Sequence, residues 1–319
     1  MAGFPQELSL ALEALVTGRD GAKLERDAKA ISENYRLRTG TGSRLLTKES
    51  EAAAYAAARM PATFAAAQAA LEAALAAGGN LEIRSVVDCG AGTGAATWAA
   101  AQLLHLESAA CLEREEAMRA VGSRLMREGG MEYAVWTGCD LTDSVPLPKG
   151  DLVIEGYMLG ELKEDMRLPV AEKLWNAAEK MLVFIEPGTP KGFANLSAVR
   201  KHLAALGAHV AAPCPAGSVS CPMAGDDWCH FAVRVQRTKL HKALKGGDAP
   251  YEDEKFCYLA LTREEPEAAC AARVLRHPLI APGRITLTLC EGGKKKTRVV
   301  TKKDPLWKRA RKIGAGDAV

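Results

Sequence analysis

The chain has 319 residues, 48% of them hydrophobic, so it can bury the core of one large domain or two modest ones. Charged residues or glycine break the longest apolar runs before they reach the roughly 18 residues that a membrane span requires, so the sequence indicates no transmembrane helix. The net charge is only +3. The N-terminus has no secretory signal, so we expect a cytoplasmic protein or a mature form, with cysteines that are free thiols, core residues or metal ligands rather than disulfides.

Residues 1–80 are expected to form an N-terminal helical region. Alanine and leucine recur there with helical spacing, Pro61 is expected to separate two helices, and Gly78 and Gly79 supply a stop signal. From Leu81 onward, short β-rich runs alternate with helical ones, which is the pattern of βα units around a mainly parallel sheet. The sequence therefore predicts an α/β fold with a doubly wound, Rossmann-like sheet.

This Rossmann-like domain is predicted to occupy residues 81–263. Its candidate strands are IRSVVDCG, SAACLERE, MEYAVWTGCD, DLVIEGYML, KMLVFIEPG and AHVAAPCP. A Cys-rich insertion at residues 213–230 comes next, and the strand-like runs HFAVRV and KFCYLALTR follow it. Residues 264–319 are predicted to form a basic, strand-containing extension.

The segment DCGAGTG at residues 88–94 is the predicted cofactor site. It follows an apolar strand and opens a helical stretch, and Gly90, Gly92 and Gly94 let the backbone turn sharply and approach a ligand closely. The spacing is GxGxG rather than the GxGxxG of dinucleotide-binding folds, so S-adenosylmethionine (SAM) is the expected cofactor. The alternative is a glycine loop with a purely structural role.

Three acids are candidates for contacts with SAM. Glu113 lies nineteen residues beyond Gly94, at the end of the second strand, where an acid can accept hydrogen bonds from both ribose hydroxyls. Asp140, after the third strand, is a candidate for the adenine amino group, and Asp88 for orienting the methionine amine through the loop. The alternative for Glu113 and Asp140 is an ordinary solvated acid.

The stretch EGYMLGEL at residues 155–162 ends the fourth strand, where methyltransferases of this fold present residues to their substrates. It contains no Asn/Asp-Pro-Pro-Tyr motif of the kind that base N-methyltransferases use. Methyl transfer depends mainly on in-line placement of the reactants, so the missing motif does not disprove activity. The catalytic residues stay unassigned.

Three cysteines in the insertion suggest a metal site. Cys214, Cys221 and Cys229 fall within sixteen residues, and a fourth ligand could be Cys290 or, less favourably, Cys257. Thiolate-rich sites in a reducing compartment hold zinc or an iron–sulfur cluster, and four cysteines suit a 4Fe–4S cube. The spacing does not choose between zinc and iron, and buried apolar cysteines are the remaining alternative.

Positive charge gathers near the C-terminus. Residues 294–312 hold ten Lys or Arg and the single acid Asp304, a local charge of +9, so the remainder of the chain carries −6. A basic block on an acidic body is typical of RNA binding, and a solvated disordered tail is the alternative. The expected phosphate-binding residues are Arg234, Arg237 and Lys245, with His241 on the same helical face, and Lys294, Lys295, Lys296, Arg298, Lys302 and Lys303.

The segments DCGAGTG, EGYMLGEL, FIEPGTPKGF, APCP, DWCHFAVRVQRTKLHKALKGG and YEDEKFCYLA resemble those of the mitoribosomal small-subunit methyltransferase-like assembly factor family and its bacterial relatives. The match extends over most of residues 30–312. The resemblance implies a class I SAM-methyltransferase fold, association with RNA and proteins of the small ribosomal subunit during assembly, and a 4Fe–4S cluster bound by Cys214, Cys221, Cys229 and Cys290.

Two departures from the family pattern affect this interpretation. Relatives usually have a small residue where this chain has Glu155, which puts the chemistry of the substrate site in doubt. They often have serine where Cys257 stands, so Cys257 is not expected to be a ligand. The expected compartment is the cytoplasm for a bacterial-type member and the mitochondrial matrix for a eukaryotic one.

We favour the hypothesis of an RNA-binding assembly factor that retains a SAM site, with a structural cluster, and that is monomeric off the ribosome. The first alternative is an active ribosomal RNA methyltransferase. The second is a zinc-stabilised small-molecule methyltransferase with an incidental basic tail.

Overall fold

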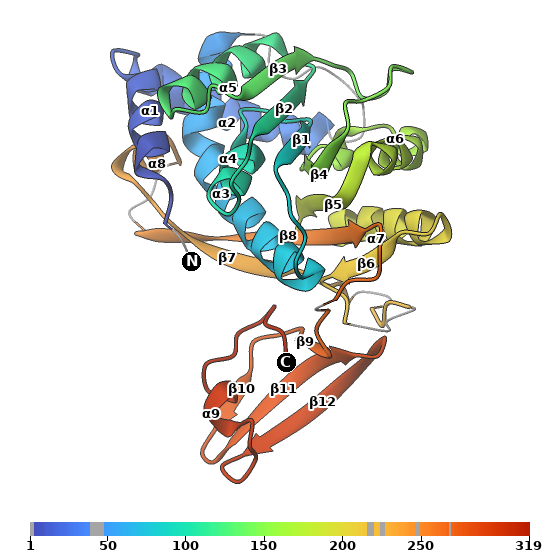
Figure 1. Cartoon of the computed structure of the whole chain (residues 1–319). Helices are drawn as coiled ribbons and strands as arrows, with labels where there is room; N and C mark the ends of the chain where they lie inside the picture. The colour runs from blue at the N-terminus through green and yellow to red at the C-terminus, as the bar shows by residue number, and fades with distance from the viewer. Residues whose placement is uncertain (1–2, 39–47, 216–219, 224–226, 246–248, 268) are drawn as a thin grey trace.

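The computed structural model describes residues 3–38, 48–215, 220–223, 227–245, 249–267 and 269–319. These residues form an N-terminal helical part, a central sheet flanked by helices, and a smaller C-terminal sheet (Figure 1). No described helix is both long enough and apolar enough to cross a membrane.

Within the described residues, eight strands form the central sheet. They are β1 (Ser85–Cys89), β2 (Ser108–Glu113), β3 (Ala134–Gly138), β4 (Gly150–Gly156), β5 (Ala178–Pro187), β6 (His209–Ala212), β7 (Phe231–Gln236) and β8 (Tyr251–Thr262). The spatial order is β3-β2-β1-β4-β5-β8-β6, with β7 also paired to β8. Strands β1 to β5 run parallel, and β8 is antiparallel to β5 and β6. The predicted doubly wound α/β fold is confirmed, and all six predicted strands are present.

The described residues before the sheet form the helices α1 (Gln6–Val16), α2 (Gly21–Arg38) and α3 (Glu49–Gly78). Helix α3 is continuous through Pro61, so the expected break between two helices is wrong. A proline inside a helix removes one backbone hydrogen bond. Most residues of α3 are nevertheless buried, many of them alanines that let the helix lie close to the sheet, and this packing offsets the loss.

Two helical layers cover the sheet. Helices α4 (Ala95–Ala101) and α5 (Glu116–Glu128) join α1 and α3 on one face, and α6 (Glu164–Ala177) and α7 (Pro190–Ala205) cover the other (Figure 1). Alternate residues of a strand pack against the two helical layers in turn, because successive side chains in a strand point to opposite faces of the sheet. Ile154 packs in the first layer and Val153 in the second.

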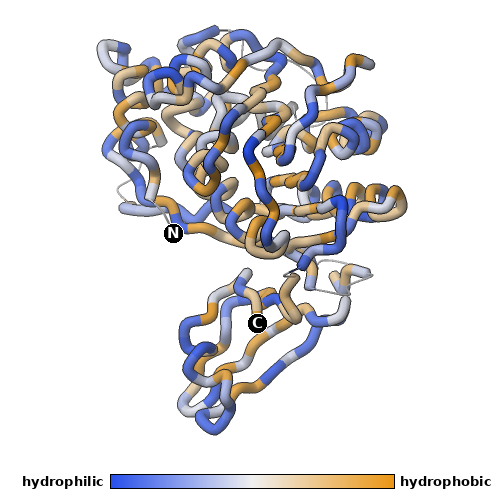
Figure 2. Tube along the Cα trace, viewed as in Figure 1, coloured by the Kyte–Doolittle hydropathy of each residue, from blue (hydrophilic) through white to orange (hydrophobic). Residues whose placement is uncertain are grey.

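The C-terminal sheet lies beside the β6–β8 part of the central sheet (Figure 1). It contains β9 (Ala272–Val274), β10 (Leu279–Ala281), β11 (Arg284–Glu291) and β12 (Lys294–Thr301), and α9 (Trp307–Ala310) follows. Strand β11 pairs with the other three strands and supplies Ile285, Leu287 and Leu289 to a small core. Strand β12 exposes nearly all of its residues, and Figure 2 shows it as a mainly hydrophilic stretch.

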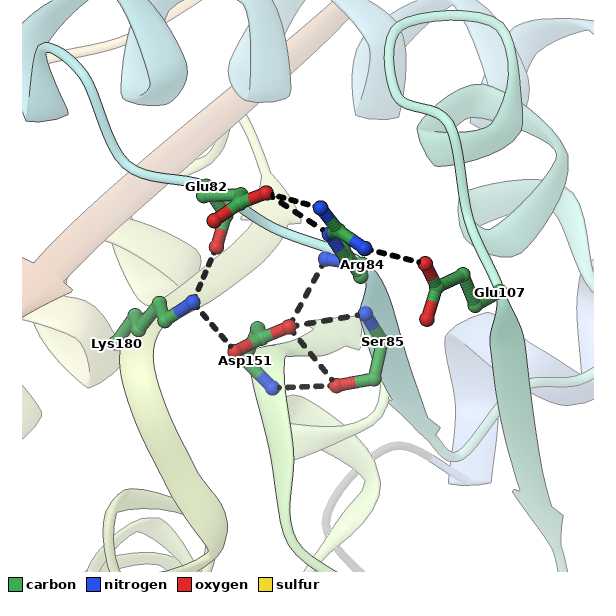
Figure 3. Close-up of polar contacts among 6 residues, drawn as sticks. All are labelled: Glu82, Arg84, Ser85, Glu107, Asp151 and Lys180. Carbon is green, nitrogen blue, oxygen red and sulfur yellow. Dashed lines mark hydrogen bonds and ion pairs between the residues drawn. The ribbon is translucent and has the colours of Figure 1, made fainter.

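A polar network joins the amino ends of β1, β4 and β5 (Figure 3). Asp151 accepts hydrogen bonds from the backbone N–H groups of Arg84 and Ser85, at 2.9 and 3.1 Å, and pairs with Lys180 Nζ at 2.9 Å. Lys180 also donates to the carbonyl of Glu82. These contacts fix the end of the sheet that lies opposite the glycine loop.

Candidate functional site

A cavity opens at the carboxyl ends of β1 to β4. Its walls are the glycine loop after β1, the ends of β2 and β3 and the turn after β4, and Tyr55, Met60 and Thr63 of α3 also line it. In open α/β sheets, ligands bind outside the carboxyl ends of the strands, at the point where the strand order reverses. The order reverses here between β1 and β4, so this cavity is the candidate cofactor site.

The glycine loop requires glycine at three positions. The φ angles are 74° at Gly90, 55° at Gly92 and 87° at Gly94, a left-handed region in which other residues are strained. A Cβ at Gly90 would lie 2.8 Å from Met158 Cγ, and one at Gly94 would lie 2.3 Å from Met126 Cε. A Cβ at Gly92 would meet no atom within 4 Å. Gly92 is therefore the position at which a ligand can come close to the backbone.

Glu113 holds the glycine loop against the end of β2. Its carboxylate accepts hydrogen bonds from the backbone N–H groups of Gly92, at 2.9 Å, and Glu115, at 2.8 Å. Burial raises the pKa of Glu113, and its side chain lines the cavity. The structure thus brings this acid and the three loop glycines into one site.

The other two candidate acids lie in different surroundings. Asp140 lines the cavity after β3 and accepts hydrogen bonds from the backbone N–H and Oγ1 of Thr142, at 3.0 and 2.7 Å. Asp88 is buried beneath the loop, where it accepts from the backbone N–H and Oγ1 of Thr97, at 3.1 and 2.7 Å. Burial raises the pKa of Asp88 to about 6. Asp88 is not among the described residues that line the cavity, so it can act on a ligand only through the loop.

The turn after β4 is built on buried carboxylates, a feature that sequence reasoning missed. It contains the short helix η1 (Leu159–Glu161). Glu155 accepts hydrogen bonds from two backbone N–H groups of this turn, at 2.7 and 2.8 Å, and Glu186 of β5 accepts from a third, at 3.3 Å. Burial raises the pKa of Glu155, and it raises the pKa of Glu186 to about 7. The EGYMLGEL motif predicted that this turn lies at the site, but it did not predict the hydrogen bonds of Glu155 and Glu186.

A further set of contacts ties α3 to the cavity. Tyr157 lines the cavity with a left-handed φ of 64°, and its hydroxyl donates to Glu254 Oε1 of β8 at 3.3 Å. Glu254 also pairs with Arg59 of α3 at 3.1 Å. Arg59 and Glu254 are 195 positions apart, so no local pattern indicated this link.

A second cavity collects the candidate metal ligands. Cys214, Cys221, Cys229 and Cys290 all line it, together with Cys257. Burial raises the pKa of Cys229, and charge on the other four thiols adds to this effect. The Cys257 thiol donates to the Cys229 carbonyl at 3.1 Å. Because Cys290 belongs to β11, the cavity joins the Cys-rich loop to the C-terminal sheet.

The described residues contain no three Cys, His, Asp or Glu side chains in an arrangement that would hold a metal ion. Residues 216–219 and 224–226 of the insertion lie outside the described chain. The donor set suits soft metals, because thiolates are the ligands that zinc and iron–sulfur clusters prefer. Burial raises the pKa of Cys290 to about 11, and the charges of Cys214, Cys221 and Cys270 act in the same direction.

Many of the candidate RNA-binding residues already have acidic partners. The ion pairs are Arg234 with Asp253 at 2.9 Å, Arg237 with Glu252 at 2.9 Å, Lys295 with Asp227 at 2.7 Å, Lys296 with Glu291 at 2.9 Å and Arg298 with Asp304 at 3.3 Å. Within the described chain, Lys294, Lys302 and Lys303 are exposed and have no ion pair.

The structure contradicts the expectation that His241 lies on an exposed helical face. Helix α8 (Lys239–Lys245) is present, but His241 is fully buried and lies 3.4 Å from Glu252. His241 therefore cannot meet a phosphate at the surface. The side chain of Lys245 lies outside the described residues.

The strand order with antiparallel β8, and the cavity formed by the glycine loop and Glu113, define a protein with the class I SAM-methyltransferase fold. Residues 49–319 match the family model described as mitochondrial small ribosomal subunit Rsm22, and the chain belongs to this family.

A curated relative is the human mitochondrial ribosome assembly protein METTL17. It is 29% identical over 256 residues, which cover 74% of this chain and 54% of METTL17. This chain therefore spans about half the length of the curated relative it matches.

Solved structures with similarity to this chain include two methyltransferases. A putative RNA methyltransferase from Pyrococcus horikoshii is 16% identical, with a TM-score of 0.41 over 62% of this chain and 83% of that chain. Magnesium protoporphyrin IX methyltransferase from Synechocystis PCC 6803 with bound SAM is 15% identical, with a TM-score of 0.40 over 78% of this chain and 99% of that chain. The fold assignment rests on the strand order rather than on these two structures.

Proposed function

We propose that this chain is a SAM-binding factor that assists the assembly of the small ribosomal subunit and contacts its RNA. Family membership supports the ribosomal role, and METTL17 is described as a mitochondrial ribosome assembly protein. The observation that carries the proposal is the position of β11. This strand contributes Cys290 to the cysteine cavity and pairs along its length with the basic strand β12.

The first cavity would hold SAM, which supplies an activated methyl group when it is bound. Glu113, at the end of β2, would accept hydrogen bonds from the ribose hydroxyls. Asp140, after β3, would accept from the adenine amino group. The methionine part would follow the glycine loop at Gly92, where the backbone is open to a ligand.

The second cavity would hold a 4Fe–4S cluster with Cys214, Cys221, Cys229 and Cys290 as its ligands, and zinc is the alternative. Four thiolates complete the coordination of such a cluster and leave no open iron. Its role would then be structural, because it would tie the Cys-rich loop to β11. The Cys257 thiol is engaged with a backbone carbonyl and is not required as a ligand.

The surface beside this cavity would contact small-subunit RNA. Strand β12 and the turn after it carry Lys294, Lys302 and Lys303, which are exposed. Three further cations of β12 form surface ion pairs: Lys295, Lys296 and Arg298. Surface ion pairs contribute little stability, so phosphates can replace the acidic partners. METTL17 is mitochondrial, which favours the matrix as the working compartment if the source of this chain is eukaryotic.

The proposal does not include methyl transfer. The Glu155 and Glu186 carboxylates accept hydrogen bonds from the turn after β4, which engages them in holding the backbone rather than a substrate. SAM would then act as a bound ligand that stabilises the fold.

Small-subunit assembly in cells that lack the gene tests the ribosomal role. We expect loss of mature small subunits on sucrose gradients, rescue by the wild-type chain and by a Gly92→Asp variant that no longer binds SAM, and no rescue by a Lys294/Lys302/Lys303→Ala variant. Rescue by the lysine variant would overturn the RNA-contact proposal. A methylated ribosomal nucleotide that disappears with the gene, and with the Gly92 variant, would establish an enzyme instead.

Anaerobic purification tests the cluster. We expect a brown protein with a broad absorption band and about four irons and four sulfides per chain. Cys290→Ser should lose the band and weaken RNA binding, whereas Cys89→Ser, a change at a buried cysteine of β1, is the matched control that keeps it. A colourless protein with one zinc would overturn the cluster assignment.

A further inference from the structure

Glu161 lies in the wall of the first cavity, and its carboxylate has no partner among the described residues. It ends η1 and lines the cavity beside Tyr157 and Glu113. Among the described residues, no hydrogen bond or ion pair reaches its carboxylate. This distinguishes it from Glu113 and Asp140, whose carboxylates already accept hydrogen bonds from neighbouring groups.

The backbone around Glu161 is firmly held. Its N–H donates to the Met158 carbonyl at 2.8 Å, and Glu155 and Glu186 accept the preceding backbone N–H groups of the turn. Leu159, two residues earlier, is fully buried. The position of Glu161 is therefore set by the fold and does not depend on a contact of its own side chain.

The surroundings of this carboxylate are acidic on balance. Burial raises the pKa of Glu161 to about 8, and the charges of Glu113, Glu186 and Glu115 act in the same direction. Arg114 opposes them, but it is shared with Glu115, at 3.3 Å, and with Asp140, at 3.8 Å. An ionised carboxylate in such a place is unfavourable unless a further cation enters.

We propose that Glu161 is a positioning residue that binds the cationic methionine end of SAM, which carries the α-ammonium and sulfonium groups. The inference rests on the proposed SAM site and assigns one more contact within it. Glu113 and Asp140 occupy the β2 and β3 side, which suits adenosine, whereas Glu161 comes from the β4 side, next to the glycine loop. SAM would supply the positive charge that would balance the Glu161 carboxylate.

Calorimetric titration of the full chain with SAM and with 5′-methylthioadenosine, which keeps the adenosine and lacks the amino-acid end, tests the inference. Loss of a charge-assisted contact is worth about 1.5–3 kcal/mol, so Glu161→Gln should weaken SAM binding about 10- to 100-fold. Binding of 5′-methylthioadenosine should change less than about twofold.

Glu164→Gln is the matched control, because Glu164 is exposed at the start of α6, three positions further along the chain. It should bind both ligands as the wild type does. An equal loss of both ligands in Glu161→Gln, or no loss of SAM, would overturn the assignment. A wild-type chain that binds neither ligand would overturn the SAM site itself, and with it this contact.

The pH dependence of SAM affinity gives a second readout. Below about pH 8, Glu161 of the free chain is protonated and must ionise to bind a cation, so wild-type affinity should rise by up to tenfold per pH unit between about pH 6 and 7.5. Glu161→Gln should lose this rise. The other titratable groups around position 161 are present in both proteins: Tyr55, Glu113, Arg114, Glu115, Glu155 and Glu186. Identical profiles would count against the proposal.

Discussion

The surroundings at the two ends of the central sheet shift the pKa of a carboxylate in opposite directions. At the amino ends, burial alone would raise the pKa of Asp151, but hydrogen bonds from Lys180, Arg84 and Ser85 lower it. At the carboxyl ends, burial raises the pKa of Glu161 to about 8. The partners of Asp151 all come from the protein, whereas the proposed partner of Glu161 is a ligand.

This contrast explains how one sheet can be both stable and receptive. A network whose groups all have partners stabilises the strands without needing anything from outside (Figure 3). Buried acids with incomplete pairing cost stability, and such groups gather at functional sites because a ligand can relieve the cost. Substitutions at the two ends should therefore change stability with opposite signs.

The largest expected effect comes from breaking the amino-end network. Asp151→Ala leaves the backbone N–H groups of Arg84 and Ser85 without their acceptor and Lys180 without its partner, and we expect a loss of about 3 kcal/mol in the free energy of unfolding. Urea denaturation at pH 7 measures this loss. SAM affinity should stay within about twofold, because the cavity is at the other end.

The pH dependence of this loss is a further check. The pKa of Asp151 is lowered from 3.8, so its contribution is fully present above that value and disappears as the pH falls through the lower pKa of the folded state. Wild type and Asp151→Ala should therefore approach each other in acid. A constant difference down to pH 2 would contradict the assigned network.

A change at the carboxyl end should act in the opposite direction. The folded-state pKa of Glu186 is raised from 4.5 to about 7, so between these values the folded chain binds more protons than the unfolded chain. The free energy of unfolding must then fall as the pH rises through this window. Glu186→Gln should remove part of that fall and stabilise the ligand-free protein by about 1 kcal/mol at pH 8. Urea denaturation from pH 5 to 8 measures it, and a destabilised variant at pH 8 would refute the contrast.

The parts of this molecule that were predictable from sequence are those set by short-range patterns. Short β-rich runs that alternate with helical ones located the strands, and the position of DCGAGTG between a strand and a helix located the cofactor loop. Grouping within sixteen residues marked Cys214, Cys221 and Cys229, whereas the choice of Cys290 over Cys257 depended on family resemblance.

The remainder depends on contacts between distant segments. Pro61 does not end its helix, because burial of α3 outweighs one lost hydrogen bond. His241 has helical spacing with Arg237, but His241 is buried and lies against Glu252 of β8, which also pairs with Arg237. The sequence placed Glu161 in the segment at the end of the fourth strand, but only the folded turn shows that its side chain lines the cavity.

The smallest effect extends the comparison of paired and unpaired charges to the RNA surface. Lys294, Lys302 and Lys303 have no ion pair in the described chain, so each can neutralise a phosphate without losing an acidic partner. Their triple replacement by alanine should reduce the slope of log K against log salt by about 2 for a small-subunit RNA transcript. Fluorescence anisotropy across a salt series measures this slope.

Triple replacement of Lys295, Lys296 and Arg298, which already pair with acids, should reduce the slope less, because an RNA phosphate must first displace those acids. Equal reductions from the two triples would show that pairing at this surface does not govern RNA binding.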